Sequence, residues 1–340
     1  MGAPSIQAPH AEPVEADELD EPVAVEVERR EGRVESGAHG ERLDRWLSSL
    51  AGEFSRNHLQ TLIEGGQVRV DGQAITSCSR RVSAGQRIEM TLLPTPESQA
   101  FRAEPVALPV VFEDEHLLVI DKPAGLVVHP APGNWSGTVL NGLLAYHAGA
   151  AALPRAGIVH RLDKDTSGLM VVAKTLSAMT ALTRAIAARE VHREYLALVH
   201  GVLRRAAFSI DAPIGRDPVS RIKMAVVPGG RAARTDVALL AARDAVSAVR
   251  CTLHTGRTHQ IRVHMASCGH ALLADSLYGG RELLGLTRQA LHAHRLGFAH
   301  PVSRQALDFN AILPADLLAA WQQIVGAQPG AGSDTMRSQG

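Results

Sequence analysis

The sequence predicts an α+β protein with two domains, and two observations support this fold class. Residues 41–93 hold two short stretches with apolar side chains at helical spacing, followed by alternating residues around an Asp71-Gly72 turn. Between residues 110 and 326, apolar strand-like runs alternate irregularly with helix-like stretches. Because such an irregular order is typical of a mixed sheet packed against helices, the larger second domain should be built on a mixed sheet.

In the small domain, apolar spacing predicts a first helix over residues 43–50 and a second helix after Ser55, whose side chain is suited to cap it. The pair Gly65-Gly66 should end the second helix. Residues 68–70 and 87–90 should form a small hairpin sheet. Residues 94–109, which contain four prolines, should be a linker between the two domains.

In the large domain, seven apolar runs predict strands and three periodic stretches predict helices. The strands are expected at residues 117–120, 125–129, 157–160, 169–173, 195–199, 237–240 and 248–253. The helices are expected at residues 138–146, 176–189 and 259–267.

Both ends of the chain are expected to be disordered tails. Residues 1–38 are acidic and Pro-rich without helical periodicity, and residues 328–340 are rich in Gly and Ser. Residues 1–36 hold ten acidic side chains and three arginines, a net charge of −7, so the rest of the chain carries +7. A basic body of this kind suits a polyanionic partner such as RNA.

Composition excludes several classes of protein. The three cysteines, Cys78, Cys251 and Cys268, lie far apart, which excludes a disulfide framework and a cysteine-rich zinc module. No apolar run approaches the roughly 20 residues that span a bilayer, and the amino terminus lacks the basic start and apolar core of a signal peptide. We therefore expect a cytoplasmic protein that does not enter a membrane.

Two polar clusters, about a hundred residues apart, are the candidate site. Residues 160–168 (HRLDKDTSG) separate two apolar strands and should form a loop on a rigid scaffold, the usual location of binding and catalytic residues. Residues 255–264 (TGRTHQIRVH) run from a turn into the start of a helix.

Residue types and spacing leave several chemistries open for these clusters. Asp163 and Asp165 could hold Mg²⁺ or act as the acid and base of a glycosidase. Asp163 could instead be a nucleophile that a nearby arginine keeps ionised. Four histidines could bind zinc, although satisfied structural histidines are commoner and no HExxH spacing exists; they are His160, His259, His264 and His270.

Five blocks, in this order, resemble the ribosomal large-subunit pseudouridine synthases, the family related to synthase A. They are residues 119–130 (VIDKPAGLVVHP), 160–169 (HRLDKDTSGL), 193–201 (REYLALVHG), 253–264 (LHTGRTHQIRVH) and 289–301 (QALHAHRLGFAHP). Residues 41–90 resemble the ribosomal-protein S-four-type RNA-binding domain that precedes the catalytic domain in several members. The resemblance implies that this small domain is followed, over residues 110–326, by a catalytic domain with a mixed, largely antiparallel sheet.

The resemblance also implies the chemistry, which converts uridine in RNA to its C-glycoside isomer with no cofactor and no metal. It makes Asp163 the nucleophile, attacking either the ribose C1′ or the base C6. Arg262 pairs with that carboxylate, Tyr195 stacks on the target base, and Arg161 enters the space that the extruded nucleotide leaves. Further RNA contacts are implied for His160, Lys164, Arg257 and His259 in the catalytic domain, and for Arg42, Arg56 and Arg69 in the small domain.

Within the family, residues 133–141 (GNWSGTVLN) and 154–160 (PRAGIVH) resemble one branch in particular. That branch implies the helix 69 hairpin of 23S ribosomal RNA as target, in free RNA or in the 50S subunit and its precursor, and a monomeric enzyme. Two departures touch substrate choice: a short stretch between residues 280 and 288, and residues 271–275 (ALLAD), where the family usually has Pro first and Gly before the Asp.

Three alternatives remain at this point. A sister synthase of the same family would modify other uridines of 23S ribosomal RNA. An S-four-type RNA-binding protein without catalysis would bind RNA only. A metal-dependent nuclease would use Asp163 and Asp165 as ligands.

Overall fold

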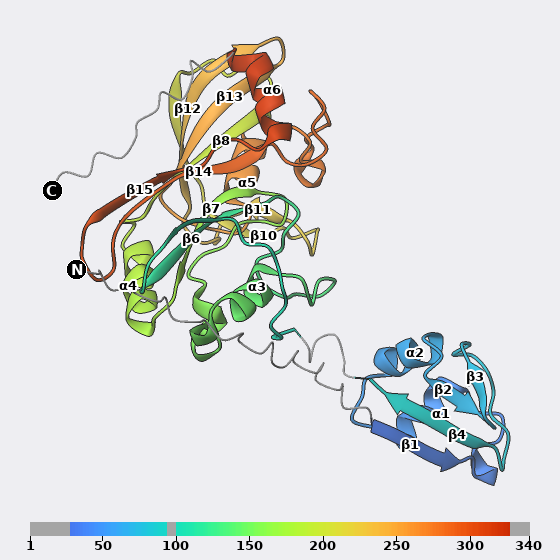
Figure 1. Ribbon diagram of the computed structural model, residues 1–340. Coiled ribbons are helices and arrows are strands. Elements are labelled where there is room, and N and C mark those ends of the chain that lie inside the picture. The colour runs from blue at the N-terminus through green and yellow to red at the C-terminus, as the bar shows by residue number, and fades with distance from the viewer. Residues whose placement is uncertain (1–27, 94–99, 327–340) are drawn as a thin grey trace, which may run out of the picture. The chain divides into compact units, whose positions relative to one another are not determined.

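The computed structural model describes residues 28–93 and 100–326. The chain divides at residue 95 into two compact units, the amino-terminal domain and the large domain (Figure 1). The elements of the amino-terminal domain are β1 (Glu28–Arg33), the 3-10 turn η1 (Ser36–Ala38), α1 (Leu43–Leu50), α2 (Arg56–Glu64), β2 (Val68–Val70), β3 (Gln73–Ile75) and β4 (Arg87–Leu92).

The amino-terminal domain has the two helices and the small sheet that the sequence predicts. Its antiparallel sheet has the order β1-β4-β2-β3. Both helices bury their apolar faces against the sheet, with Leu43, Leu47 and Leu59 fully buried. The Ser55 hydroxyl accepts a hydrogen bond from the backbone N–H of His58 and caps α2.

The predicted boundary of the amino-terminal tail is wrong, because residues 28–38 are part of this domain. Strand β1 pairs with β4 from Glu28 opposite Leu92 to Arg33 opposite Arg87. Its sequence, ERREGR, has no apolar alternation, because an exposed edge strand is held by its backbone ladder and by ion pairs such as Glu31–Arg87. Residues 1–27 lie outside the described part of the chain, as do 327–340, which include the second predicted tail.

The large domain is built on one nine-stranded mixed sheet of order β5-β6-β7-β14-β8-β13-β12-β9, with β15 also paired to β14. Only β7 and β14 pair in parallel among the described strand pairs, so the predicted mixed, largely antiparallel sheet is confirmed. Its strands are β5 (Val110–Glu113), β6 (Leu117–Lys122), β7 (Ser167–Ala173), β8 (His192–His200), β9 (Ala207–Asp211), β12 (Arg234–Arg243), β13 (Val246–Leu253), β14 (Leu291–Ala299) and β15 (Ala306–Asn310). The other elements are a hairpin of β10 (Ile214–Arg216) and β11 (Met224–Val226), the helices α3 (Val139–Tyr146), α4 (Leu176–Ala187), α5 (Gln260–Ser267) and α6 (Ala315–Val325), and the 3-10 turns η2 (Ala148–Ala152), η3 (Pro154–Gly157) and η4 (Ser276–Tyr278).

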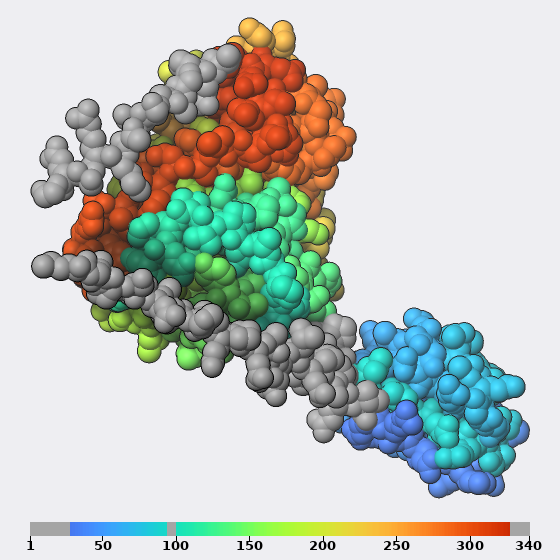
Figure 2. All heavy atoms as spheres, in the orientation of Figure 1, coloured from blue at the N-terminus to red at the C-terminus, as the bar shows by residue number. Residues whose placement is uncertain are grey.

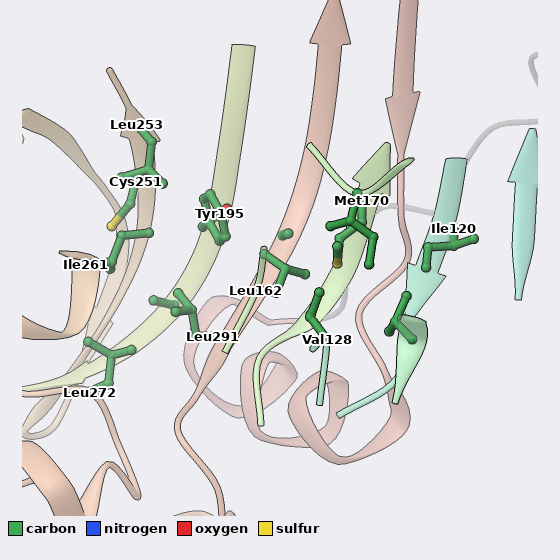
Figure 3. Packing of buried hydrophobic residues seen from close by; sticks show 14 of the residues in the cluster. Ile120, Val128, Leu162, Met170, Tyr195, Cys251, Leu253, Ile261, Leu272 and Leu291 are labelled. Atoms are coloured by element: carbon green, nitrogen blue, oxygen red, sulfur yellow. The ribbon is translucent and has the colours of Figure 1, made fainter. Parts of the chain in front are cut away.

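Helices cover both faces of this sheet. α4 packs on β7, and α6 packs on β12 and β13 (Figure 1). The opposite face carries a core to which α3, α5 and residues 160–163 contribute, and Figure 3 shows Leu162 pointing into it together with Val128, Met170 and Tyr195. Buried Leu162 therefore anchors the loop whose neighbouring residues are the candidate site residues.

Two predicted strands, at residues 125–129 and 157–160, are irregular in the structure. Gly125 and Gly157 both have positive φ, at 85° and 80°, which interrupts extended backbone at these points. A Cβ on Gly157 would lie 1.9 Å from the carbonyl oxygen of Ala173, so only glycine allows this close approach to β7. Ile158 makes a single isolated bridge to Val172 instead of a strand.

The predicted linker is also too long, because residues 100–109 belong to the large domain. The side-chain amide of Asn141 donates to the carbonyl oxygens of Ala100 and Arg102, and the N–H of Asp121 donates to that of Pro109. In the space-filling view, the teal part of the chain after residue 100 is packed on the large domain (Figure 2). Residues 94–99 lie outside the described ranges. Across those ranges, no helix has the length and apolar character needed to cross a bilayer.

Candidate active site

The two polar clusters meet at one cavity of about 440 Å³ in the large domain. Residues 158–163 form one wall and residues 253–262 form another, while Tyr195 of β8 and Leu291 of β14 come from the sheet. Asp163, Arg161, His160, Tyr195, Arg257, His259 and Arg262, all proposed from the sequence, line this cavity.

His160 fixes the start of the loop to the sheet. Its Nε2 accepts a hydrogen bond of 3.0 Å from the backbone N–H of Val171 in β7. Burial lowers the pKa of His160 to about 3, so the ring is neutral and can accept this bond at neutral pH. This contact occupies one of the two ring nitrogens of His160.

Lys122, which sequence reasoning missed, fixes the far side of the loop. Its side chain is fully buried at the end of β6, and its ammonium donates to the carbonyl oxygens of Pro123, Leu126 and Lys164 at 2.8–2.9 Å. Burial lowers the pKa of Lys122 to about 8, against the charges of Asp165 and Asp163, which raise it. No local sequence pattern marks this role, because all three partners of the ammonium are backbone carbonyl oxygens.

Asp163 is held by Arg262, as the family resemblance implies. Nη1 of Arg262 lies 3.1 Å from Oδ2 of Asp163, while Nε and Nη2 of the same guanidinium both donate to Asp275 at 2.8 Å. The side chains of Arg262 and Asp275 are 7% and 1% exposed, and that of Asp163 is 17% exposed. Burial opposes the charge on Arg262, but Asp275 and Asp163 outweigh it and raise its pKa. Asp163 is therefore an accessible carboxylate beside a permanently charged partner.

Asp275 reaches Arg262 from a turn that the family usually builds with glycine. Ala274, which precedes it, has a φ of 56° in the left-handed region. Ala274 thus adopts a backbone conformation that is unfavourable for alanine and common for glycine. The Asp275 carboxylate still bonds to Arg262 although the sequence of this turn differs from that of the family.

His259 and Tyr278 complete the surroundings of Asp163. Nε2 of His259 lies 3.9 Å from Oδ1 of Asp163, and its Nδ1 is 2.7 Å from the hydroxyl of Tyr278. That hydroxyl accepts the backbone N–H of Met224, which favours donation of the phenolic proton to Nδ1 and leaves the ring proton on Nε2, facing Asp163. Burial lowers the pKa of His259, with Asp163 acting in the other direction. The Tyr278 ring also lies 5.0 Å from the guanidinium carbon of Arg262.

Tyr195 presents a buried aromatic ring on the strand beside Asp163. It is 6% exposed, and burial raises its pKa to about 12, so the phenol is protonated at neutral pH. The backbone of Tyr195 lies opposite Cys251 of β13 and Ala293 of β14, which fixes its position in the middle of the sheet.

The remaining predicted contacts are distributed differently. Arg161 is exposed, and Arg257 donates from Nε to the carbonyl oxygen of Ala232. Lys164 has an exposed side chain that does not line the cavity. In the amino-terminal domain, both Arg42 and Arg56 bond to the fully buried Asp44, and Arg69 bonds to the carbonyl oxygen of Gly72.

The histidines considered for zinc are committed elsewhere. His264 contacts Thr235 and the carbonyl oxygen of Ala212, and His270 contacts that of His200. Within residues 28–93 and 100–326, no group of three or more His, Cys, Asp or Glu side chains could hold a metal ion.

The chain is similar to known proteins of one enzyme family. The model of the RNA pseudouridylate synthase family matches residues 116–267, and that of the S4 domain matches residues 41–88. The ribosomal large subunit pseudouridine synthase D of Nitrosomonas europaea is 48% identical over 293 residues, which cover 84% of this chain and 85% of the relative. The chain belongs to the RNA pseudouridylate synthase family. It is therefore an isomerase that converts uridine to pseudouridine in RNA.

Two further proteins agree with this assignment. The synthase D of Neisseria meningitidis serogroup B is 46% identical over 315 residues, 89% of this chain and 84% of the relative. The structure of human RNA pseudouridylate synthase domain containing 1 superimposes with a TM-score of 0.50 at 27% identity, covering 62% of this chain and 86% of the human one. The family and the S-four-type domain expected from the sequence are confirmed, and the branch indicated by residues 133–141 and 154–160 is that of synthase D.

Proposed function

We propose that this synthase modifies the uridines of helix 69 in 23S ribosomal RNA, with Asp163 as the nucleophile. The observation that carries the chemistry is the position of Asp163: an accessible carboxylate in a cavity, fixed beside the buried cation Arg262. A carboxylate is ionised at neutral pH, can form a bond to carbon and can leave again.

The reaction needs no net gain or loss of atoms. Asp163 adds to the ribose C1′ or to the base C6, the N1–C1′ bond breaks, and the uracil turns within the cavity. A new bond then joins C5 to C1′. If Asp163 is on C1′, this bond displaces it; if Asp163 is on C6, it leaves afterwards, as C5 gives up its proton. C5 loses a proton and N1 gains one, so the product is an isomer of the substrate.

Arg262 and Tyr195 have separate tasks in this proposal. Arg262 keeps the carboxylate charged and aimed, because its other two donors are locked on Asp275. Tyr195 offers its ring to the flipped uracil, which has lost its stacking neighbours. Arg161, exposed at the cavity, takes the place of the extruded nucleotide in the RNA.

The choice of RNA rests on the relatives and on the charges around the cavity. Both bacterial relatives described above are named for the large ribosomal subunit. A hairpin loop is a favourable target because its bases are already partly unstacked, which lowers the free energy of flipping. We further propose a monomer that acts in the cytoplasm, on free 23S RNA or on the 50S subunit and its precursor, since one chain supplies the whole cavity lining.

Carbodiimide-based reverse-transcription mapping of ribosomal RNA from a deletion strain tests the target. Loss of the pseudouridine stops in helix 69 supports the proposal. Intact helix 69 with stops missing elsewhere in 23S RNA assigns the protein to a sister synthase of different specificity.

The role of Asp163 is tested with Asp163→Asn in a tritium-release assay on 23S transcript. The amide fills the same space, and Arg262 keeps its partner Asp275, so the variant should fold and bind RNA while its turnover is abolished. Turnover near that of the wild type rejects the assignment.

A further inference from the structure

Arg193 is a buried cation, and its side chain has no partner in the described part of the chain that would explain why a charge is buried there. It lies at the start of β8 and is 6% exposed. Its Nε is buried without a hydrogen-bond partner, and the Arg193 side chain makes no other hydrogen bond or ion pair with residues 28–93 or 100–326. The guanidinium of arginine carries a permanent positive charge.

The atoms around Arg193 show that this charge faces the active-site cavity. Arg193 lines the cavity, as does His129, whose Nε2 is likewise buried without a partner. The adjacent carboxylate, Glu194, does not compensate it, because Glu194 pairs with Arg295 instead. Burying a charge without a partner is unfavourable, so Arg193 lowers the free energy of unfolding of the RNA-free protein.

The cavity lining is strongly cationic. Asp163 is its one acidic residue, and Arg262 already neutralises Asp163. Besides Arg262, the lining holds five further arginines: Arg155, Arg161, Arg189, Arg193 and Arg257. The ligand that completes this site therefore carries negative charge.

The position of Arg193 relative to Tyr195 indicates which part of an RNA ligand it meets. Two residues apart on one strand, both side chains leave the same face of the sheet, about 7 Å apart along it. Gly256 gives the guanidinium its room, since a Cβ at that position would lie 2.9 Å from Nη1 of Arg193. A base stacked on Tyr195 thus has its backbone within reach of Arg193.

We propose that Arg193 is a substrate-binding residue that holds a backbone phosphate flanking the flipped uridine. This inference rests on the proposed placement of the target nucleotide between Asp163 and Tyr195. A phosphodiester carries a full negative charge throughout binding and offers oxygens that the planar guanidinium can bind in pairs. The uracil carbonyls carry negative charge only transiently during the reaction, so they are weaker partners for a permanent cation than a phosphate is.

The first test separates this role from a structural one by thermal unfolding of the RNA-free protein. Replacing an unpaired buried cation with Arg193→Gln should leave Tm unchanged or raise it, because no partner loses a contact. A structural arginine would lower Tm on replacement, and that result overturns the proposal. Arg250→Gln is the matched control, since Arg250 lies exposed on the adjacent strand β13.

The second test is a double-mutant cycle that alters Arg193 in the protein and a phosphate in the RNA. The substrate is a hairpin around a uridine that the wild-type protein is first shown to modify, made with or without a neutral methylphosphonate on each side of that uridine. For the wild type, the neutral linkage at one side should weaken binding roughly 10- to 100-fold, the range for one charge-assisted hydrogen-bonded pair. Arg193→Gln should weaken binding of the native hairpin by a similar factor, and the methylphosphonate should add little further loss.

Two outcomes of the cycle contradict the proposal. Independent, multiplying losses show that Arg193 does not touch either phosphate. A fall in kcat with unchanged affinity shows that Arg193 acts on the uracil. Arg193→Lys, which keeps the charge without the fork, should recover part of the lost affinity. If the modified uridine lies outside helix 69, the proposed target fails, but the cycle still tests Arg193.

Discussion

The ammonium of Lys122 donates a hydrogen bond of 2.9 Å to the carbonyl oxygen of Lys164, the residue that follows Asp163 in the chain. This bond joins the end of β6 to the loop of residues 160–168, 42 residues further on. Together with the bond between His160 and Val171, it fixes the loop on both sides of Asp163. The position of the Asp163 carboxylate thus depends on bonds that Lys122 and His160 make with backbone groups.

Lys122→Met should therefore lower both stability and activity. The variant leaves the partly buried carbonyl oxygens of Pro123, Leu126 and Lys164 without the ammonium that donates to them, which costs about 2–4 kcal/mol of the free energy of unfolding. Urea unfolding measures the loss, and tritium release measures turnover. Lys164→Met is the matched control, because its exposed side chain should change stability by no more than about 0.5 kcal/mol. Equal stability of the two variants contradicts the role assigned to Lys122.

Replacement of Arg262 should lower both stability and turnover, because Arg262 pairs with Asp275 and with Asp163. Arg262→Ala leaves Asp275 buried without its cation and Asp163 without its pair, which should lower the free energy of unfolding by about 3–5 kcal/mol and abolish turnover. Arg262→Lys restores a charge but cannot bond to both carboxylates with three donors in one plane, so it should recover stability in part and little activity. An active Ala variant would show that the pairing is dispensable.

The sequence predicted the elements whose residue pattern is regular. Buried β6, β7, β8 and β13 appear as apolar runs, and the predicted N-cap Ser55 marks the start of α2. Strand β14 was missed because its run LHAHRLGFA is broken by polar residues, yet His292 is buried there against Ser167. Helix α6 was overlooked although Leu317, Trp321 and Ile324 follow helical spacing.

The same contrast holds for the site. Asp163, Arg262 and Tyr195 stand in blocks that resemble a family, and the structure brings them to one cavity. Asp275 and Lys122 act through contacts with residues distant in the chain or through backbone carbonyls, which no local pattern reveals. Such contacts become visible only when the fold places the two partners together.

Acid should destabilise the protein through His160. Its folded pKa of about 3 lies below the ordinary value of 6.5, so the unfolded chain binds more protons between these values. The free energy of unfolding contributed by this residue is therefore complete above pH 6.5 and falls by about 1.4 kcal/mol per pH unit as pH drops toward 3. In urea unfolding between about pH 7 and pH 4, His160→Gln should show a shallower decline, because its amide oxygen can accept the N–H of Val171 without titrating. An identical decline in both proteins contradicts the assignment.

Two deletions should reveal whether the amino-terminal domain contributes RNA contacts or only charge. Residues 1–95 hold 16 acidic side chains and ten arginines, a net charge of −6, and residues 1–27 hold seven acidic side chains and no Lys or Arg. By net charge alone, both deletions would tighten binding to RNA.

We expect the deletion of residues 1–27 to tighten binding or to leave it unchanged. The deletion of residues 1–95 should instead weaken the affinity for 23S transcript and flatten the dependence of that affinity on salt. A weakening that runs against the change in net charge can come only from lost contacts with phosphates or bases, in which Arg42, Arg56 and Arg69 are the candidates. Filter binding across salt concentrations measures both quantities. Unchanged affinity and slope after the larger deletion would mean that the large domain alone binds the substrate.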